Sequence, residues 1–92
     1  MSKIQESKIQ QVETERGRYL FKLEQVLADK NISKNQLVRD TITDFKSVQK
    51  LCRGDLVRID IYVVARICDY LNCDPWDIVE YQRAEKSDVT ND

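Results

Sequence analysis

Apolar residues recur at helical spacing in several segments, which predicts a protein built mainly from short helices. Leu23, Val26 and Leu27 follow an i, i+3, i+4 pattern, so we expect a helix that ends near Lys30. The residues before it, 18–23, favour a short strand that leads into this helix. Because the 92 residues include only two glycines and one proline, helices joined by short links are favoured over a β-sandwich with many tight turns.

A second helix is predicted from Lys34 to Thr41. The four residues from Ser33 read S-K-N-Q, which matches the capping box, in which serine and glutamine satisfy free amides at a helix start. On this helix we expect Leu37, Val38 and Thr41 to face the core.

A third helix is predicted from Phe45 to Arg53, after a link of about three residues, the length found where two helices cross steeply. Asp44 is suited to cap its start, and Gly54 is suited to end it in a left-handed conformation. Its apolar stripe consists of Val48, Leu51 and Cys52.

The remaining pattern predicts two further helices. Asp60 caps the fourth, and its expected buried face holds Ile61, Val64, Cys68 and Leu71, with Ala65 and Ile67 beside them. The sequence D-P-W-D at residues 74–77 starts the fifth helix, and the residues that follow either continue it or form a strand through Gln82. The predicted fold is therefore all-α, with five helices around one core, and a short pair of terminal strands stays open.

Charge is distributed unevenly, although the net charge is only −1. Residues 19–54 carry seven basic and four acidic side chains, whereas residues 55–92 carry four basic and nine acidic ones. Salt weakens electrostatic interactions between exposed charges that are more than about 8–10 Å apart. A local basic face can therefore attract a polyanion even when the chain as a whole is almost neutral. The third helix offers such a face in Lys46, Gln49, Lys50 and Arg53, whose side chain types bind phosphates and base edges.

The composition argues against several other functions. The chain has no histidine, which removes Ser-His-Asp and Cys-His pairs and most zinc sites. Cys52, Cys68 and Cys73 have neither disulfide-framework nor zinc spacing, so we interpret them as small buried thiols in a reducing cytosol. Without a glycine-rich phosphate loop or a long apolar run, we expect a cytoplasmic protein that is no enzyme and has no metal, cofactor or membrane segment.

The order of these features resembles the lambda-repressor and Cro-like, or XRE-like, helix-turn-helix regulators, and in particular their small stand-alone branch. The matching segments are residues 33–37 at the start of the second helix, Val48 and Leu51 in the third, and residues 67–74 and 77–81 in the closing helices. The resemblance as a whole covers residues 20–81. The resemblance implies a five-helix lambda-repressor-like DNA-binding domain whose third helix enters the major groove.

Three positions depart from the family pattern. The family usually has a small residue at Val38, often has glycine at Ile42, and usually has an apolar residue at Thr43. Because a β-branched residue is a poor choice for a left-handed conformation, we expect the turn to be either strained or differently shaped. In the second case, Ile42 would point inward and supply the packing that Thr43 cannot.

The resemblance also implies a set of DNA-facing residues. They are Ser33, Lys34, Asn35, Asp44, Phe45, Lys46, Gln49, Lys50, Arg53 and Arg58. The first three would meet the DNA backbone at a helix N-terminus and the last two would reach phosphates, which leaves the middle five in the groove. Asp44 fits a cap better than a base reader, and Phe45 either presses on a thymine methyl group or covers the edge of the core.

Two functions from different classes agree with these features. The first is a transcriptional repressor of bacterial or phage type that binds double-stranded DNA sequence-specifically. It would act as a homodimer, with the contact around Trp76, Ile78 and Tyr81, helped by residues 4–12. The second is a protein-binding module, such as an antitoxin or inhibitor subunit, that keeps the fold without DNA recognition. The acidic C-terminal part and the unusual turn favour the second function, whereas the basic face of the third helix favours the first.

Composition also divides the chain. Residues 18–82 are predicted to form the helix-turn-helix domain, between a polar N-terminal extension, 1–17, and a polar C-terminal tail, 83–92. The extension contains SKIQ twice, and we interpret it as a tail or a frayed helix. The alternative is an arm that touches DNA or a partner subunit.

Overall fold

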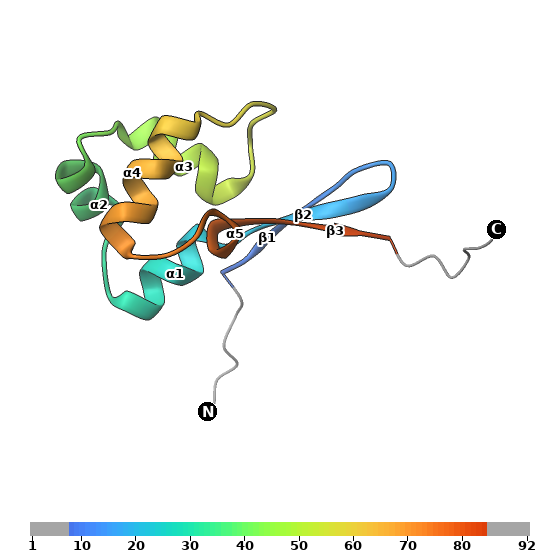
Figure 1. Ribbon diagram of the computed structural model, residues 1–92, viewed down its shortest axis with the longest axis horizontal. Coiled ribbons are helices and arrows are strands. Elements are labelled where there is room, and N and C mark those ends of the chain that lie inside the picture. The colour runs from blue at the N-terminus through green and yellow to red at the C-terminus, as the bar shows by residue number, and fades with distance from the viewer. Residues whose placement is uncertain (1–7, 85–92) are drawn as a thin grey trace.

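Five helices lie between strands at the two ends of the described chain (Figure 1). The computed structural model describes residues 8–84. In chain order the elements are β1 (Gln10–Glu13), β2 (Gly17–Phe21), α1 (Leu23–Lys30), α2 (Lys34–Thr41), α3 (Phe45–Arg53), α4 (Ile61–Leu71), α5 (Pro75–Ile78) and β3 (Val79–Arg83). The helix-turn-helix pair α2 and α3 has the bounds that the sequence predicts. Within residues 8–84, none of the helices combines the length and the apolar character that a bilayer crossing needs.

The five predicted helices are present, but the fold is not purely all-α. In place of the pair of terminal strands left open by the sequence, three strands form an antiparallel sheet in the order β1-β2-β3. Cross-strand partners include Val12 with Tyr19, and Tyr19 with Tyr81. Since side chains alternate between the faces of a sheet, these three residues lie on one face. Figure 1 shows the hairpin of β1 and β2, with β3 beside it, extending away from the helices.

Strand β1 corrects the interpretation of residues 1–17 as a tail or a frayed helix, at least for residues 10–13. Its sequence, Q-Q-V-E, has little apolar pattern, and only Val12 packs against the core. Backbone pairing with β2 therefore holds this strand, and pairing of this kind leaves a weak signal in the sequence. Residues 1–7 and 85–92, which are seven of the 17 residues of the predicted extension and eight of the ten residues of the predicted tail, lie outside the described residues.

One hydrophobic core joins the helices to the base of the sheet. Its buried members are Phe21, Leu23, Leu27, Leu37, Val48, Leu51, Cys52, Ile67, Cys68, Leu71 and Ile78. The predicted inner face of α4 needs a correction at its start, because Ile61 is 69% exposed and Ala65 is also exposed. The core covers the C-terminal half of α4, so the first turn extends beyond it.

Each of the four longer helices ends in the same backbone motif. Asn31, Ile42, Gly54 and Asn72 follow α1 to α4 in the left-handed conformation, with φ between 54° and 72°. The amide after each of them donates to the carbonyl five residues earlier, at 2.9–3.2 Å. These bonds define Schellman motifs, which satisfy carbonyl groups that a helix end leaves free. The chain can therefore turn sharply after every helix although it contains only two glycines.

The structure decides between the two shapes expected for the helix-turn-helix link. Ile42 has φ 54° and is 82% exposed, so the expectation that it points inward is wrong. The link therefore has the conformation that glycine favours, but with a β-branched residue in it. Thr43 is partly buried, and its hydroxyl lies 2.9 Å from that of Thr41, which also donates to the carbonyl of Leu37 at 2.6 Å.

We expect Ile42→Gly to stabilise the protein. Because the isoleucine side chain buries little, its removal loses little packing, and glycine relieves a left-handed strain of about 1 kcal/mol. Urea denaturation should show a higher midpoint with an unchanged slope. The matched control is Val57→Gly, at a 95% exposed position without positive φ, which should give no gain. A lower midpoint for Ile42→Gly would contradict the assignment of strain.

Candidate nucleic-acid interface

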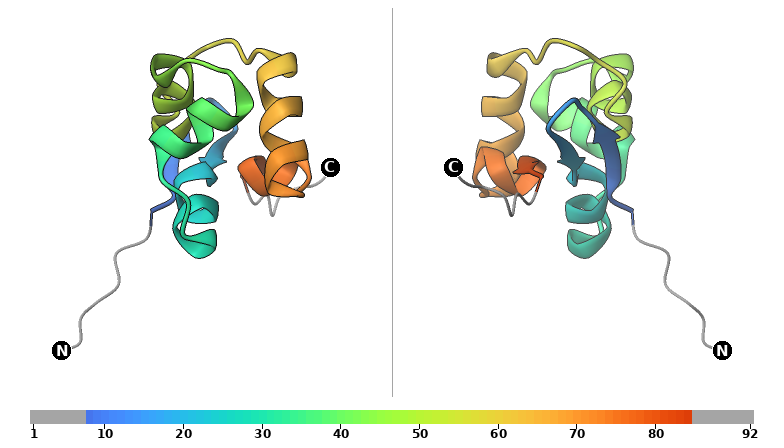
Figure 2. Two further views of the ribbon diagram at one scale, coloured as in Figure 1. Left: turned by 90° about the vertical axis from the view of Figure 1, so that its left-hand side faces the viewer. Right: turned by 90° about the vertical axis from the view of Figure 1, so that its right-hand side faces the viewer.

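Helices α2 and α3 lie on one side of the helical body, with α4 on the other side (Figure 2). The link between them comprises residues 42–44. Arg66 of α4 donates to the carbonyl of Ile42 at 3.1 Å, and the hydroxyl of Tyr70 donates to Asp40 at 2.6 Å. Two side chains of α4 thus hold the end of α2 and the turn in place. The hydrogen bond from Tyr70, followed by that from Arg39, lowers the pKa of Asp40, so this carboxylate stays ionised.

Both helices of the pair begin at the caps that the sequence predicts. The hydroxyl of Ser33 accepts from the amide of Gln36 at 3.0 Å. The second half of the expected capping box does not form, because the Gln36 side chain donates to the hydroxyl of Tyr70 at 3.4 Å. This tertiary contact competes for the glutamine, which a sequence pattern cannot foresee.

Asp44 is fully engaged as the cap of α3. Its carboxylate accepts from the Ser47 hydroxyl at 2.7 Å and from the Ser47 amide at 3.0 Å. These two bonds, the hydroxyl first, lower the pKa of Asp44. A carboxylate that is ionised and already bonded here would repel a phosphate, so Asp44 positions the helix and is poorly placed to read bases.

The outward face of α3 is cationic. Val48, Leu51 and Cys52 are buried, and with 100° of rotation per residue the opposite direction falls on Lys46, Lys50 and Arg53. All three of these cations are exposed. Between Phe45 and Arg53 the helix carries no acidic residue, so nothing on α3 itself neutralises this face.

Gln49 lies on the flank of α3 that faces the start of α2. The ammonium group of Lys34 donates to its amide oxygen at 2.7 Å and lies 3.8 Å from a carboxylate oxygen of Glu24. Gln49 is accordingly half-buried, which the periodicity of α3 alone could not show. A bidentate contact to adenine needs both the oxygen and the nitrogen of the amide, so Lys34 would have to release the oxygen first.

Phe45 lies on the same flank, one turn earlier, and is 44% exposed. Both alternatives for this side chain therefore stay open, since a half-exposed ring can cover the core edge and still contact a thymine methyl group. Ser33 and Asn35 are exposed at the start of α2, beside the partly buried Lys34. The hydrogen bond from Lys34 to Gln49 links this start of α2 to α3, so both belong to the candidate interface.

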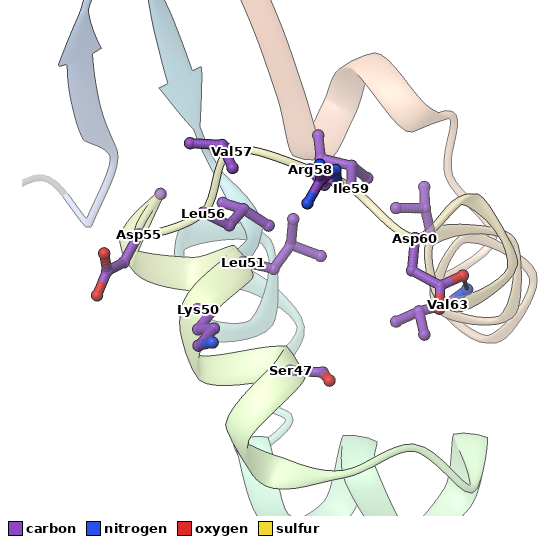
Figure 3. Close-up of a pocket in the computed structure, with 12 residues that line it drawn as sticks. Ser47, Lys50, Leu51, Asp55, Leu56, Val57, Arg58, Ile59, Asp60 and Val63 are labelled. Carbon is purple, nitrogen blue, oxygen red and sulfur yellow. Dashed lines mark hydrogen bonds between the residues drawn. The ribbon is translucent and has the colours of Figure 1, made fainter.

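Arg58 lies in the loop between α3 and α4 and is exposed. Figure 3 shows this loop beside Lys50 and Ser47 of α3, with Asp60 and Val63 at the start of α4. These residues line one open pocket of about 660 Å³. Lys50 and Arg58 are thus brought to the same part of the surface from different elements, and only the tertiary structure shows this proximity.

The remaining chemistry of the described residues is limited. Residues 8–84 contain no group of three or more histidine, cysteine or carboxylate side chains that could hold a metal ion. Cys52 is fully buried on the inner face of α3, and burial raises the pKa of its thiol to about 11, so it stays protonated at neutral pH. This thiol belongs to the core that supports α3.

Comparison with known proteins identifies the fold family. The family model of the Cro/C1-type helix-turn-helix DNA-binding domain matches residues 22–84, and the chain belongs to this family. The resemblance seen in the sequence is therefore confirmed. In a crystal structure, the transcriptional regulator VanUg superposes with a TM-score of 0.60, at 27% identity, over 79% of this chain and 96% of that one. The chain matches none of the curated proteins with which it was compared.

Proposed function

We propose that the protein is a sequence-specific regulator of transcription that binds double-stranded DNA and represses the genes beside its site. The observation that carries this proposal is the outward face of α3, which exposes Lys46, Lys50 and Arg53 and has no carboxylate. The chain that carries this face belongs to a family of DNA-binding domains. DNA supplies a dense line of phosphates that such a face attracts. A bound dimer would compete with polymerase for the same DNA in the cytoplasm, which is the simplest route to repression.

In this proposal, contacts to phosphates and to bases come from different elements. Ser33, Lys34 and Asn35, at the amide-rich start of α2, would hold one stretch of backbone. Arg53 and Arg58 would hold another. The residues assigned to the groove are Phe45, Lys46, Gln49 and Lys50, with Asp44 as the cap that orients them.

The alternative, a protein-binding module without DNA recognition, keeps one supporting observation. Residues 55–92 have nine acidic and four basic side chains, which suits a basic partner better than DNA. The unusual turn no longer supports it, because Ile42 adopts the left-handed conformation that a glycine would have there. A titration with DNA distinguishes the two functions.

We expect binding to mixed genomic fragments to weaken steeply with salt. If a dimer neutralises about six phosphates, the logarithm of the binding constant should fall against that of the salt concentration with a slope near −5. Fluorescence anisotropy at four or five salt concentrations measures this slope. Binding that is absent at low salt, or independent of salt, would favour the protein-binding alternative.

Substitution should separate base reading from phosphate contact. Gln49→Ala should cost about 1–3 kcal/mol on the preferred site and relax the preference at one base pair, because it removes the amide that would pair with adenine once Lys34 releases its oxygen. Arg58→Ala should weaken binding to all sequences alike and reduce the salt slope by about one. The measurement is binding of each variant to the selected site and to its single-base variants.

A Lys34→Met variant is the control for this comparison. It frees the amide oxygen of Gln49 and removes one candidate phosphate contact, but it leaves the outward face of α3 unchanged. Circular dichroism establishes that all three variants are folded. If Gln49→Ala weakens every sequence equally while Arg58→Ala changes the base preference, the assignment of α3 as the reading helix is wrong.

We also propose that the regulator is a homodimer, since two half-sites on DNA match a two-fold protein. Of the three residues expected in the contact, Ile78 is fully buried and belongs to the core of the protomer. Tyr81 is 41% exposed, and its ring already packs against that of Tyr19 in a tilted arrangement, with centroids 4.9 Å apart. Trp76 is 64% exposed on α5, so it is the best remaining anchor for a second copy.

Trp76→Glu should shift the protein from dimer to monomer, because a carboxylate would replace a large apolar side chain at the centre of the contact. Sedimentation equilibrium between about 1 and 100 µM measures the change. Tyr62→Glu is the matched control, since Tyr62 is 74% exposed on α4, outside the proposed contact. A monomeric parent protein over this range, with and without DNA, would contradict the dimer.

A further inference from the structure

Two of the three cysteines meet at the end of α4. Cys68 is buried in the last turn of this helix, and Cys73 is partly buried just after it. The amide of Cys73 donates to the carbonyl of Cys68 at 3.0 Å, and the two thiols lie close enough to interact with each other. The left-handed residue Asn72 between them turns the chain so that the second cysteine lies back on the first.

The other helix ends show why this position matters. In a Schellman motif, the third residue from the helix end and the second residue after it commonly make a side-chain contact. At the end of α1 these positions are Leu27 and Ile32, which pack on the core as two aliphatic side chains. At the end of α4, the same geometry brings together two thiols. The motif thus places in contact two groups that can form a covalent bond.

The two thiols differ in their access to solvent. Cys73 lines an open pocket of about 580 Å³ between α1 and the segment that joins α4 to α5. Cys68 is 7% exposed and lies behind it. An oxidant can therefore reach Cys73 first, and the thiol that would resolve the resulting intermediate is already beside it.

We propose that Cys68 and Cys73 form a reversible disulfide, with a small disulfide such as oxidised glutathione as the oxidant. The thiolate of Cys73 attacks one sulfur of glutathione disulfide and releases one glutathione thiolate. The thiolate of Cys68 then attacks the sulfur of Cys73 and releases the second one. The two protons lost by the cysteines end on the two glutathione molecules, so one glutathione disulfide is reduced for each protein disulfide formed.

The surroundings make this reaction slow at neutral pH. Burial is the main cause that raises the pKa of Cys68, to about 11, and it also raises the pKa of Cys73. Six charged groups surround the two thiols. They are Lys22 just before α1, Asp29 and Lys30 in α1, Asp69 in α4, and Asp74 and Asp77 at the start of α5. Acids outnumber cations among them, so the thiolate forms are scarce and the rate should rise with pH. The disulfide would thus report sustained oxidation and would not respond to a brief pulse.

Trypsin offers a direct assay, because Cys68 and Cys73 share the peptide of residues 67–83, whereas Cys52 lies in residues 51–53. The full chain is incubated for hours at pH 8 in glutathione buffers of increasing oxidised fraction, free thiols are alkylated, and the digest is analysed by mass spectrometry. In oxidising buffers, we expect peptide 67–83 to carry no alkyl group and to be two hydrogen atoms lighter than the peptide with two free thiols. Peptide 51–53 should stay alkylated.

A second measurement tests whether the fold favours the bond. The same titration in urea gives the glutathione ratio at which the unfolded chain oxidises, and the folded chain should oxidise at a ratio at least tenfold more reducing. Cys73→Ser is the control, which should form no internal disulfide. Equal ratios for the folded and unfolded chains, peptide 67–83 doubly alkylated in every buffer, or a disulfide that involves Cys52 instead would overturn the proposal.

Discussion

The burial of one stripe of α3 is the constraint on which the candidate interface depends. Val48, Leu51 and Cys52 must leave water, and a helix that buries one face must expose the opposite one. Lys46, Lys50 and Arg53 therefore point outward as a consequence of core packing, before any contact with DNA is considered. A cap at Asp44 and a left-handed turn at Gly54 then limit the helix to the length that this packing supports.

The helix ends impose a second constraint, because the chain must reverse direction four times within a short distance. It does so with left-handed residues in Schellman motifs, and only one of these residues is a glycine. At Ile42 the demand of the turn overrides the preference of the residue, and Arg66 bonds to its carbonyl from α4. Tertiary contacts thus hold a strained link in the part of the molecule that sets the angle between α2 and α3.

The weak net charge of the chain and its proposed attraction to DNA are compatible because charge acts locally. Two acidic side chains close to the interface are already hydrogen-bonded, Asp44 in the cap of α3 and Asp40 to Tyr70. The hydrogen bonds that lower their pKa values also fix where their negative charge lies. The exposed cations of α3 keep no such intrahelical partner, so the local field on this face differs in sign from the charge of the whole chain.

Much of the fold can be predicted from the sequence, because patterns of neighbouring residues determine where the helices begin and end and which face of each is buried. The bounds of α2 and α3, the caps at Ser33 and Asp44 and the buried stripe of α3 are all set by residues within one or two turns of each other. Three features needed the tertiary structure. Strand β1 forms through backbone pairing with β2 and has almost no apolar pattern of its own. The orientation of Ile42 depends on how the turn packs, and the contact of Gln49 with Lys34 joins residues 15 positions apart. Sequence periodicity can show which side of a helix faces inward, but which side chain from another element meets it is decided only when the chain folds.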